Sequence, residues 1–306
     1  MKAIEAATHG IPAKVCQCVE VDDPSPPDAG EVIIEIEAAP INPADLLMIQ
    51  GLYPGVSEFP SRLGIEGVGR VARIGNGVDG LKFGDRVISL ARTNWAERVS
   101  LSAAQVVPVP KTVDALQLAM LKANPATAHL MLRDYVSIGA GDWIIQNADN
   151  SAVSRHVIRL ARAVDSFSVN VVRRNSLIAP LTEYGANAVG GGATARLADL
   201  LAYGGTAVNY GFLSGEPCHV TPDQLILRGL TLKGFWLAPK FGTMKPVEIR
   251  SHYDHLVQLF ADGTLSCTGR GNLHHRPGPR RSLRCHARRP QRQDPNHGKQ
   301  AGRLRT

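Results

Sequence analysis

The sequence predicts an α/β protein in which a small, partly open antiparallel β-barrel precedes a doubly wound parallel sheet. Short apolar strands separated by Gly and Asp turns fill the first hundred residues, and amphipathic helices alternate with buried strands from about residue 113. Closely spaced strands are typical of a barrel, whereas strand–helix alternation predicts parallel strands joined by crossover helices. The 306 residues are enough for about two domains of ordinary size.

The barrel strands are expected at 31–40, 67–75 and 85–90. The first reads EVIIEIEAAP and alternates acidic with apolar residues, and Gly and Asp turns lie between the other two. In the second half, the periodicity of apolar residues and the turn signals predict a series of helices and strands. These are a helix at 113–135 interrupted at Pro125, a strand at 142–148, a helix at 151–164, a strand at 168–174, a helix at 177–185, a helix at 194–205, and strands at 206–211 and 230–237.

One strand–helix repeat of the parallel sheet is too short. The strand after Gly185 can only be ANAVG, and it runs directly into the helix that begins near Thr194. A strand–helix repeat of this kind of sheet needs about 30 residues. The sequence therefore predicts a Rossmann-type sheet shortened by one helix–strand step near 188–193, with a gap or a changed pairing at its centre.

The net charge of +7 is confined to the end of the chain. Residues 267–306 contain ten Arg and one Lys against the single acid Asp294, so the remainder is mildly acidic. This tail has almost no apolar periodicity and is expected to be disordered. Its lack of aromatic residues argues against nucleic-acid binding by base stacking. No apolar run is long enough for a membrane span and no signal peptide is evident, which predicts a cytoplasmic protein without a membrane partner.

The turn at 147–155 is the first candidate site. It joins a parallel strand to a helix, where backbone N–H groups and the helix dipole favour a pyrophosphate, although a plain strand–helix turn explains it equally well. Arg173 and Arg174 end the next strand, where arginines suit the 2′-phosphate of NADP; the alternative is a solvated basic strand end. Trp236 lies at the end of the strand expected at 230–237 and either caps a pocket or belongs to the core.

Several motifs together resemble the medium-chain dehydrogenase/reductase superfamily, and within it the NADPH-dependent 2-enoyl thioester reductases. The motifs are INPADLLMIQGLYPG (41–55), GIEGVGRVARIG (64–75), GDRVI (84–88), NPATAHLML (124–132), IIQNADNSAVSRHVI (144–158), VNVVRR (169–174) and GFWL (234–237). The resemblance extends over about residues 1–265. It implies a GroES-like catalytic domain at 1–118, an NADP-binding Rossmann domain at 119–262, and an aberrant basic tail at 263–306.

The resemblance also implies the site residues. Tyr53 matches the family's tyrosine that assists protonation on the carbonyl side of the enoyl group, and a phenol keeps its proton at neutral pH. The residues that match the family's NADP(H)-binding segments are Asn124, Asn150, Ser151, Ala152, Val153, Arg173, Arg174, Tyr210, Gly211, Phe212, Leu213, Phe235, Trp236 and Leu237. No metal is expected, because Ile65 stands where zinc-dependent relatives have a His. Asp149 departs from the family in the phosphate turn, where a carboxylate repels a pyrophosphate.

The resemblance therefore predicts hydride transfer from NADPH to the β-carbon of a 2-enoyl-CoA or 2-enoyl-ACP. The acyl thioester is the expected partner, together with a second copy of the chain in a homodimer. Within the same fold, the alternative is a quinone reductase-like enzyme. Another alternative is a degenerate, inactive homologue, which the missing step and the altered tail favour.

Overall fold

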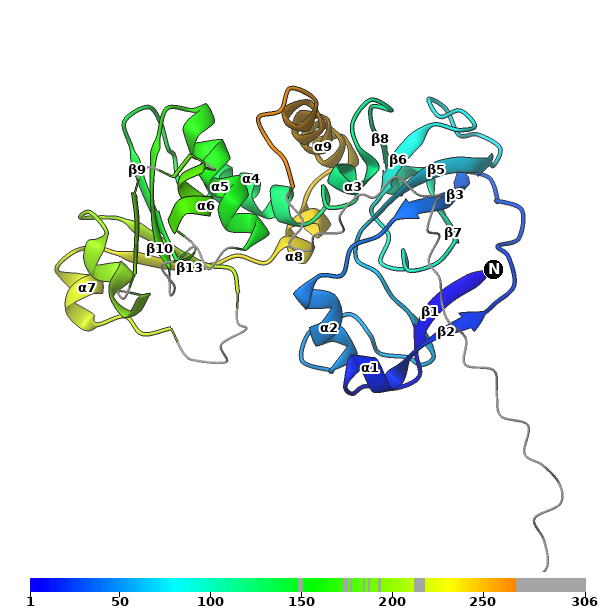
Figure 1. The fold of residues 1–306 in the computed structure, drawn as a ribbon, viewed down its shortest axis with the longest axis horizontal. Helices are drawn as coiled ribbons and strands as arrows, with labels where there is room; N and C mark the ends of the chain where they lie inside the picture. Colours follow the sequence, from blue (N-terminus) through cyan, green and yellow to red (C-terminus); the bar gives the residue numbers. More distant parts are fainter. Residues whose placement is uncertain are drawn as a thin grey trace, which may run out of the picture. The chain divides into compact units, whose positions relative to one another are not determined.

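A computed structural model describes residues 1–147, 151–172, 176, 178–183, 185–186, 188–191, 194–211 and 218–267 (Figure 1). Residues 1–271 form one compact unit, and the second unit, 272–306, lies outside the described residues, as does the whole predicted tail after Cys267. The elements are β1 (Lys2–Ala6), α1 (Pro12–Val15), β2 (Cys16–Glu20), β3 (Glu31–Ala38), α2 (Pro43–Ile49), β4 (Ser61–Arg62), β5 (Gly67–Ile74), β6 (Arg86–Ser89), β7 (Arg98–Ser102), η1 (Ala103–Gln105), β8 (Val106–Pro108), α3 (Ala115–Leu118), α4 (Asn124–Asp134), β9 (Trp143–Gln146), α5 (Ala152–Ala163), β10 (Phe167–Val172), α6 (Ile178–Glu183), β11 (Ala188–Gly191), η3 (Thr194–Leu200), β12 (Thr206–Asn209), α7 (Pro222–Ile226), β13 (Thr231–Gly234), α8 (Leu237–Thr243) and α9 (Pro246–Ala261).

The first hundred residues fold into antiparallel sheets, as the sequence predicts. Five strands pair in the order β7-β3-β5-β6-β8, and three more pair in the order β2-β1-β4. The strands expected at 31–40, 67–75 and 85–90 are β3, β5 and β6. Val32 and Ile34 of β3 pack with Val71 of β5 and Val87 of β6 in one buried cluster. Burial of these apolar side chains holds the sheet together.

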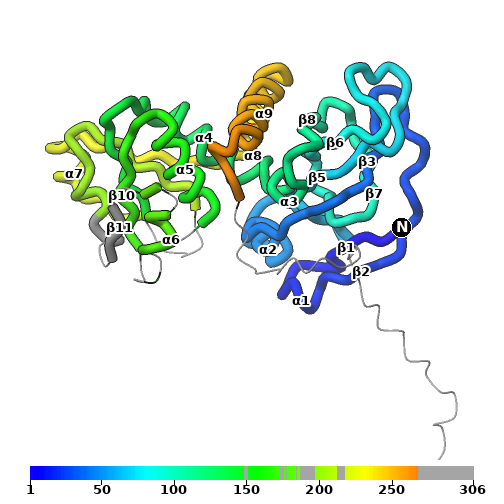
Figure 2. Tube along the Cα trace, turned by 45° about the horizontal axis from the view of Figure 1, so that its top comes forward, coloured from blue at the N-terminus to red at the C-terminus, as the bar shows by residue number. Residues whose placement is uncertain are grey.

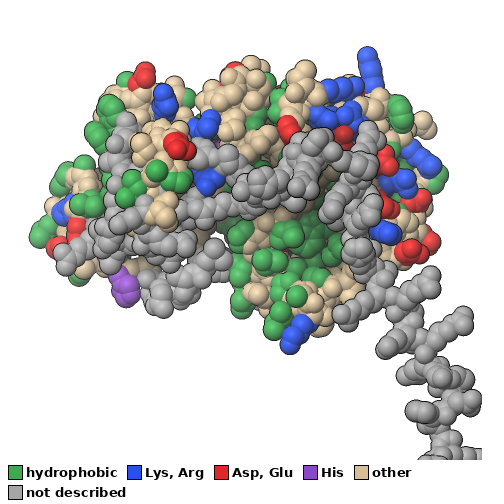
Figure 3. Space-filling model, in the orientation of Figure 1, with side chains coloured by type: hydrophobic (Ala, Val, Ile, Leu, Met, Phe, Trp, Pro, Cys, Tyr) green, Lys and Arg blue, Asp and Glu red, His purple; other side chains and the backbone are tan. Residues whose placement is uncertain are grey.

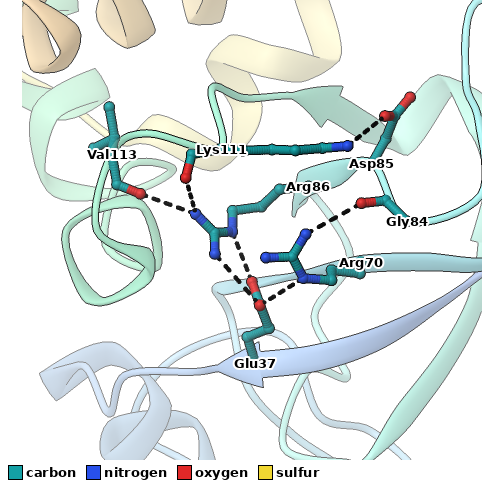
Figure 4. A network of polar contacts seen from close by, with 7 residues as sticks. All are labelled: Glu37, Arg70, Gly84, Asp85, Arg86, Lys111 and Val113. Carbon is teal, nitrogen blue, oxygen red and sulfur yellow. Dashed lines mark hydrogen bonds and ion pairs between the residues drawn. The ribbon is translucent and has the colours of Figure 1, made fainter.

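An ion network on one side of this sheet joins three of its strands (Figure 4). The carboxylate of Glu37 on β3 accepts hydrogen bonds of 2.8 Å from Nε of Arg70 on β5 and from Nε of Arg86 on β6. Arg86 also donates to the carbonyls of Lys111 and Val113 at 3.0 and 2.9 Å. Burial alone would raise the pKa of Glu37, but the hydrogen bonds and charges of the two arginines outweigh it and hold that pKa below its ordinary value.

The second half contains parallel strands with helices against them. β9 and β11 each pair in parallel with β10, and β12 pairs in parallel with β13. Helix α5 lies beside β10 in the trace of Figure 2, and α6 contacts β11. The amphipathic helix expected at 151–164 is α5, and its apolar face is buried. This is the strand–helix alternation of a Rossmann-type domain.

The parallel strands do not form one continuous sheet among the described residues. β11-β10-β9 and β12-β13 are separate sheets, so β9 and β12 each have one partner strand. The interior strands of parallel sheets are normally paired on both sides and buried on both faces. All four residues of β13 are exposed, and those of β12 are half-buried or exposed. This break lies where the sequence predicts a missing helix–strand step.

Three expected elements differ from the observed ones. The helix expected at 194–205 is a 3-10 helix that ends at Leu200, and the strand expected at 230–237 ends at Gly234, after which Trp236 caps α8. Pro125 does not interrupt a helix: it is the second residue of α4, where proline removes no intrahelical hydrogen bond. The break in the predicted helix lies before it, between α3 and α4.

The largest hydrophobic cluster joins residues from distant parts of the chain. Val68 and Ile88 of the barrel strands lie in one cluster with Leu130 of α4, Val153 of α5 and Leu256 of α9. Leu265 and Cys267 belong to it as well, so packed structure continues past the boundary predicted at residue 263. In the part of the chain that the structure describes, no helix is both long and apolar enough to cross a membrane.

The contact between α4 and α9 predicts how stability depends on pH. His129 of α4 and His252 of α9 approach to 3.2 Å between their Nδ1 atoms, and burial lowers the pKa of His129 to about 4 and that of His252 to about 3. In the unfolded chain both rings take up a proton near their ordinary pKa of 6.5. Because the unfolded state then binds more protons, we expect the free energy of unfolding to fall as the pH decreases from about 6.5 to about 4.

Urea unfolding measured across this pH range tests the prediction. The variant His252→Gln should show a smaller loss of stability on acidification than the wild type, whereas the same change at exposed His219 should leave the pH dependence as it was. Equal pH dependence in all three proteins would show that the α4–α9 contact is not the cause.

Candidate active site

The end of helix α2 determines where Tyr53 lies. The N–H of Gly51 donates to the carbonyl of Met48 at 3.1 Å, and the N–H of Leu52 donates to that of Leu47 at 2.9 Å. This pair of hydrogen bonds is a Schellman motif, and Gly51 takes the positive φ of +75° that the motif requires. Only glycine adopts this conformation without strain. The chain therefore leaves α2 in a fixed direction, and Tyr53 follows two residues later.

The ring of Tyr53 contacts Trp236. Their centroids are 5.8 Å apart and their planes are nearly perpendicular, which is a favourable edge-to-face contact between aromatic rings. Burial raises the pKa of the Tyr53 phenol, and the contact with Trp236 and the charge of Arg92 only partly offset that effect. The phenol therefore keeps its proton at neutral pH and can act as a proton donor.

Exposed apolar side chains lie at both ends of α2, the helix that leads to Tyr53. Figure 3 shows hydrophobic side chains gathered over α2. Ile41 before the helix is 68% exposed, and Leu52 after it is 63% exposed. Exposed apolar patches of this kind are common where a ligand or a partner binds. The surface beside Tyr53 is suited to a hydrocarbon chain.

Ser151 is the N-cap residue of helix α5, within the turn that the sequence singles out. Its Oγ accepts a hydrogen bond of 3.1 Å from the N–H of Ser154 and lies 3.5 Å from the hydroxyl of Tyr210, which follows β12. The structure thus brings together two of the expected cofactor-binding segments, at the carboxyl ends of β9 and β12. The N-terminus of a helix of this length attracts anions through its free N–H groups and its dipole.

The other expected cofactor-binding residues have different environments. Val153 and Phe235 are buried in the core, so only their backbone atoms could face a ligand. Ala152 and Leu237 are half-buried, as is Asn124 at the start of α4. A Cβ atom on Gly211 would meet no atom within 4 Å, which leaves room for a ligand. The residues Asn150, Arg173, Arg174, Phe212 and Leu213 lie outside the described residues, and so does Asp149.

A hydrogen-bonded pair of amide side chains next to the Ser151 turn was not predicted from the sequence. Nε2 of Gln146 on β9 donates to Oδ1 of Asn170 on β10 at 2.7 Å and to the carbonyl of Ser154 at 2.9 Å. Asn170 is completely buried. A buried amide needs hydrogen-bond partners, and here the partners fix the turn that carries Ser151. Polar residues inside the apolar strands WIIQ and SVNVV were the signal available in the sequence.

A group of buried ionisable side chains next to α2 was also not predicted from the sequence. Asp45, Glu66 and Lys122 are each at most 8% exposed. The sequence shows Glu66 within GIEGVG and Lys122 within an apolar run, but nothing in either pattern says that they meet. Within the described ranges, no three potential ligand side chains are arranged to hold a metal ion.

Comparison with protein families and curated proteins gives consistent results. Residues 28–111 match the alcohol dehydrogenase GroES-like domain family. The chain is 33% identical over 293 residues to the mitochondrial enoyl-[acyl-carrier-protein] reductase of Dictyostelium discoideum, covering 84% of each protein. It is 34% identical over 300 residues to the human protein of the same name, covering 87% of this chain and 80% of that protein. The alignment with the Dictyostelium protein has 293 positions, which is more than the 84% of this chain that it covers. The alignment therefore contains gaps in this chain.

Solved structures show the same fold. The mitochondrial 2-enoyl thioester reductase Etr1p/Etr2p heterodimer of Candida tropicalis superimposes with a TM-score of 0.78 at 24% identity, covering 88% of this chain and 90% of that one. The Etr1p/NADP/crotonyl-CoA complex gives a TM-score of 0.79 at the same identity and coverage. A putative NADPH:quinone reductase of Bacillus thuringiensis gives 0.78 at 25% identity, covering 87% of this chain and 88% of that one.

The expected cytoplasmic location is wrong on this evidence. The Dictyostelium and human relatives are named as mitochondrial proteins, and so is the rat protein. The expectation rested on the absence of a recognisable signal peptide, which does not distinguish the two compartments.

The cap of α5 gives a stability prediction. Replacing an N-cap serine by alanine costs about 1 kcal/mol. We therefore expect Ser151→Ala to lower the free energy of unfolding in urea by this amount, because the N–H of Ser154 loses its acceptor. The control is Ser251→Ala in the middle of α9, which is exposed and should change stability little. An equal loss in both variants would contradict the capping role.

Proposed function

Because this chain belongs to the enoyl-[acyl-carrier-protein] reductase family of the medium-chain dehydrogenase/reductase superfamily, we propose that it reduces the carbon–carbon double bond of a 2-enoyl thioester with NADPH. The thioester is carried by CoA or by acyl carrier protein. The contact between Tyr53 and Trp236 carries this proposal, because it joins a protonated phenol to the segment that follows β13. The proton donor and a cofactor-binding segment of the family then lie side by side.

The described residues fit a dinucleotide. β9, α5 and β10 form a parallel strand–helix–strand unit, and Ser151 begins the helix with small neighbours. Tyr210 and Gly211 lie beyond the carboxyl end of β12, where ligands of such sheets bind. Arg173 and Arg174 follow β10 directly and would provide two guanidinium groups for the 2′-phosphate of NADPH.

The proposed reaction divides the work between cofactor and protein. Bound NADPH supplies the hydride that adds to the β-carbon of the enoyl group. Electron density then moves toward the thioester carbonyl, and Tyr53 donates its proton on that side. The exposed apolar side chains of Ile41 and Leu52, at the two ends of α2, would provide a surface for the acyl chain.

A direct assay distinguishes enoyl thioester reduction from two alternatives, a quinone reductase-like activity and an inactive homologue. A quinone reductase-like activity is favoured by the similarity to the Bacillus protein. An inactive homologue is favoured by the break between β9 and β12. We expect purified protein to oxidise NADPH with crotonyl-CoA and not with a quinone. The opposite preference supports the quinone reductase, and no oxidation together with no NADPH binding supports the inactive homologue.

We also propose a homodimer. β13 pairs with β12 along one edge, and all four of its residues are exposed, so a second copy has a strand edge to meet. A relative with the same fold is a heterodimer of two reductase chains. Light scattering on the purified chain distinguishes a dimer from a monomer.

Tyr53→Phe tests the proton donor. General acid catalysis contributes about 10²-fold or more to a rate, so we expect kcat with crotonyl-CoA to fall by that factor. Binding of NADPH should change little, because the ring and its contact with Trp236 remain. Tyr203 is 82% exposed, and Tyr203→Phe is the matched control with unchanged kcat. A Tyr53→Phe enzyme with wild-type kcat would exclude this role.

Replacing both Arg173 and Arg174 by alanine tests the cofactor preference. Hydrogen bonds to charged groups are worth about 1.5–3 kcal/mol, so we expect the KM for NADPH to rise by about 10- to 100-fold. The KM for NADH, which lacks the 2′-phosphate, should be nearly unchanged. Arg250→Ala on the exposed face of α9 is the control. Loss of affinity for both cofactors alike would point to a general structural effect.

A further inference from the structure

We propose that Glu66 is a positioning residue that holds the Tyr53 segment and the Asn124 segment in register. This inference rests on the proposed function, in which Tyr53 donates a proton and Asn124 belongs to a cofactor-binding segment. Glu66 itself is completely buried beside β5 and lies outside both segments. Its effect on the reaction would therefore be exerted through the residues that it binds.

The two oxygens of the Glu66 carboxylate bind different parts of the chain. Oε1 accepts a hydrogen bond of 2.7 Å from Nδ2 of Asn42, and Oε2 accepts one of 2.7 Å from the N–H of Ala123. Asn42 is the N-cap residue of α2, the helix that leads to Tyr53. Ala123 is the N-cap residue of α4, and Asn124 is the first residue of that helix. A single rigid carboxylate thus joins the starts of the two helices.

Asp45 makes the first connection stiffer. Its Oδ2 accepts the N–H of Asn42 at 2.8 Å, and its Oδ1 accepts the N–H of Ile65, the neighbour of Glu66, at 2.9 Å. The first turn of α2 is therefore bound at two places to the segment that leads into β5. Because α2 is short and ends in the hydrogen-bonded turn at Gly51, a shift of its first turn would move Tyr53 as well.

Lys122 supplies the compensating charge. Its ammonium group donates to the carbonyls of Ile65, Leu90 and Ala91 at 2.6, 2.8 and 2.8 Å. Burial raises the pKa of Glu66 to about 7 and lowers that of Lys122 to about 8, and the charge of each opposes the shift of the other. Burying ionisable groups costs free energy, and apolar residues in the same places would often stabilise the core at least as much. The buried group of Glu66 and Lys122 is therefore better explained by a role in fixing the positions of the segments that it binds.

The geometry has consequences for catalysis. Misplacing a reacting group by about 1 Å can cost about 10²-fold in rate. Glu66→Gln keeps the shape of the side chain but replaces one acceptor by a donor and removes the negative charge. One of the two connections is therefore lost, and the other is weakened because its acceptor is no longer charged. Asn42→Ala removes the connection to α2 and leaves the one to Ala123.

The kinetic test uses four proteins: the wild type, Glu66→Gln, Tyr53→Phe and the double variant. We expect Glu66→Gln to lower kcat with crotonyl-CoA about tenfold or more and to leave the Kd for NADPH within about twofold. In the Tyr53→Phe background the same change should lower kcat by a clearly smaller factor, because the route through Tyr53 is already removed. An equal factor in both backgrounds would overturn the proposal. Glu20→Gln, at an exposed site on β2, is the control.

Hydrogen–deuterium exchange tests the same proposal without any activity. We expect Glu66→Gln to speed exchange in 43–53 and in 123–127, and Asn42→Ala to speed it in 43–53 alone. Exchange in β3 should stay as in the wild type in both variants. Unchanged exchange in the two segments would overturn the positioning role. If the wild type does not reduce crotonyl-CoA, the proposed function fails while this readout still decides the role of Glu66.

Discussion

A carboxylate with no access to water must find a hydrogen-bond donor for each of its oxygens. In this protein that requirement is met by Asn42 and by the backbone of Ala123, which belong to segments about eighty positions apart in the chain. The positions of Tyr53 and Asn124 follow from how these two donors are held. The chemistry of the site therefore depends on a buried group that touches neither substrate nor cofactor in the proposed reaction.

Among the described residues, the parallel strands form two separate sheets. Among the described strands, β9 and β12 end separate sheets, and the 3-10 helix η3 lies against β9. Backbone groups at a sheet edge need water or another partner, and an interior strand without a neighbour loses that pairing. The curated relatives align with gaps in this chain, which agrees with a missing segment. The turn at Ser151 is nevertheless held by hydrogen bonds, because Gln146 donates to the carbonyl of Ser154 and to the side chain of Asn170.

The sequence predicted three of the barrel strands, β3, β5 and β6, and the alternation of strands and helices, because periodicity and turn residues are local signals. It did not predict α9, whose packing depends on residues from both halves of the chain. It predicted the short repeat, since the count of residues between Gly185 and Thr194 is itself a local fact. The strand expected to run through Trp236 ends at Gly234, because tertiary packing of Phe235 decides where the chain turns.

Part of the candidate site was predictable from the sequence, and part was not. Motif resemblance selected Tyr53, Ser151 and Trp236, and the structure brings Tyr53 to Trp236 and Ser151 to Tyr210. The network around Glu66 was not predictable, because its members are far apart in sequence and each looks ordinary alone. Only the fold shows that Lys122 and Glu66 are buried in the same neighbourhood.

The most direct test of the account follows the hydride itself. The protein would be incubated with crotonyl-CoA and NADPH that carries deuterium on the transferred position of C4, and the product analysed by mass spectrometry and NMR. The account predicts butyryl-CoA with a single deuterium on the β-carbon. Unreacted crotonyl-CoA, or deuterium at any other carbon, would contradict it.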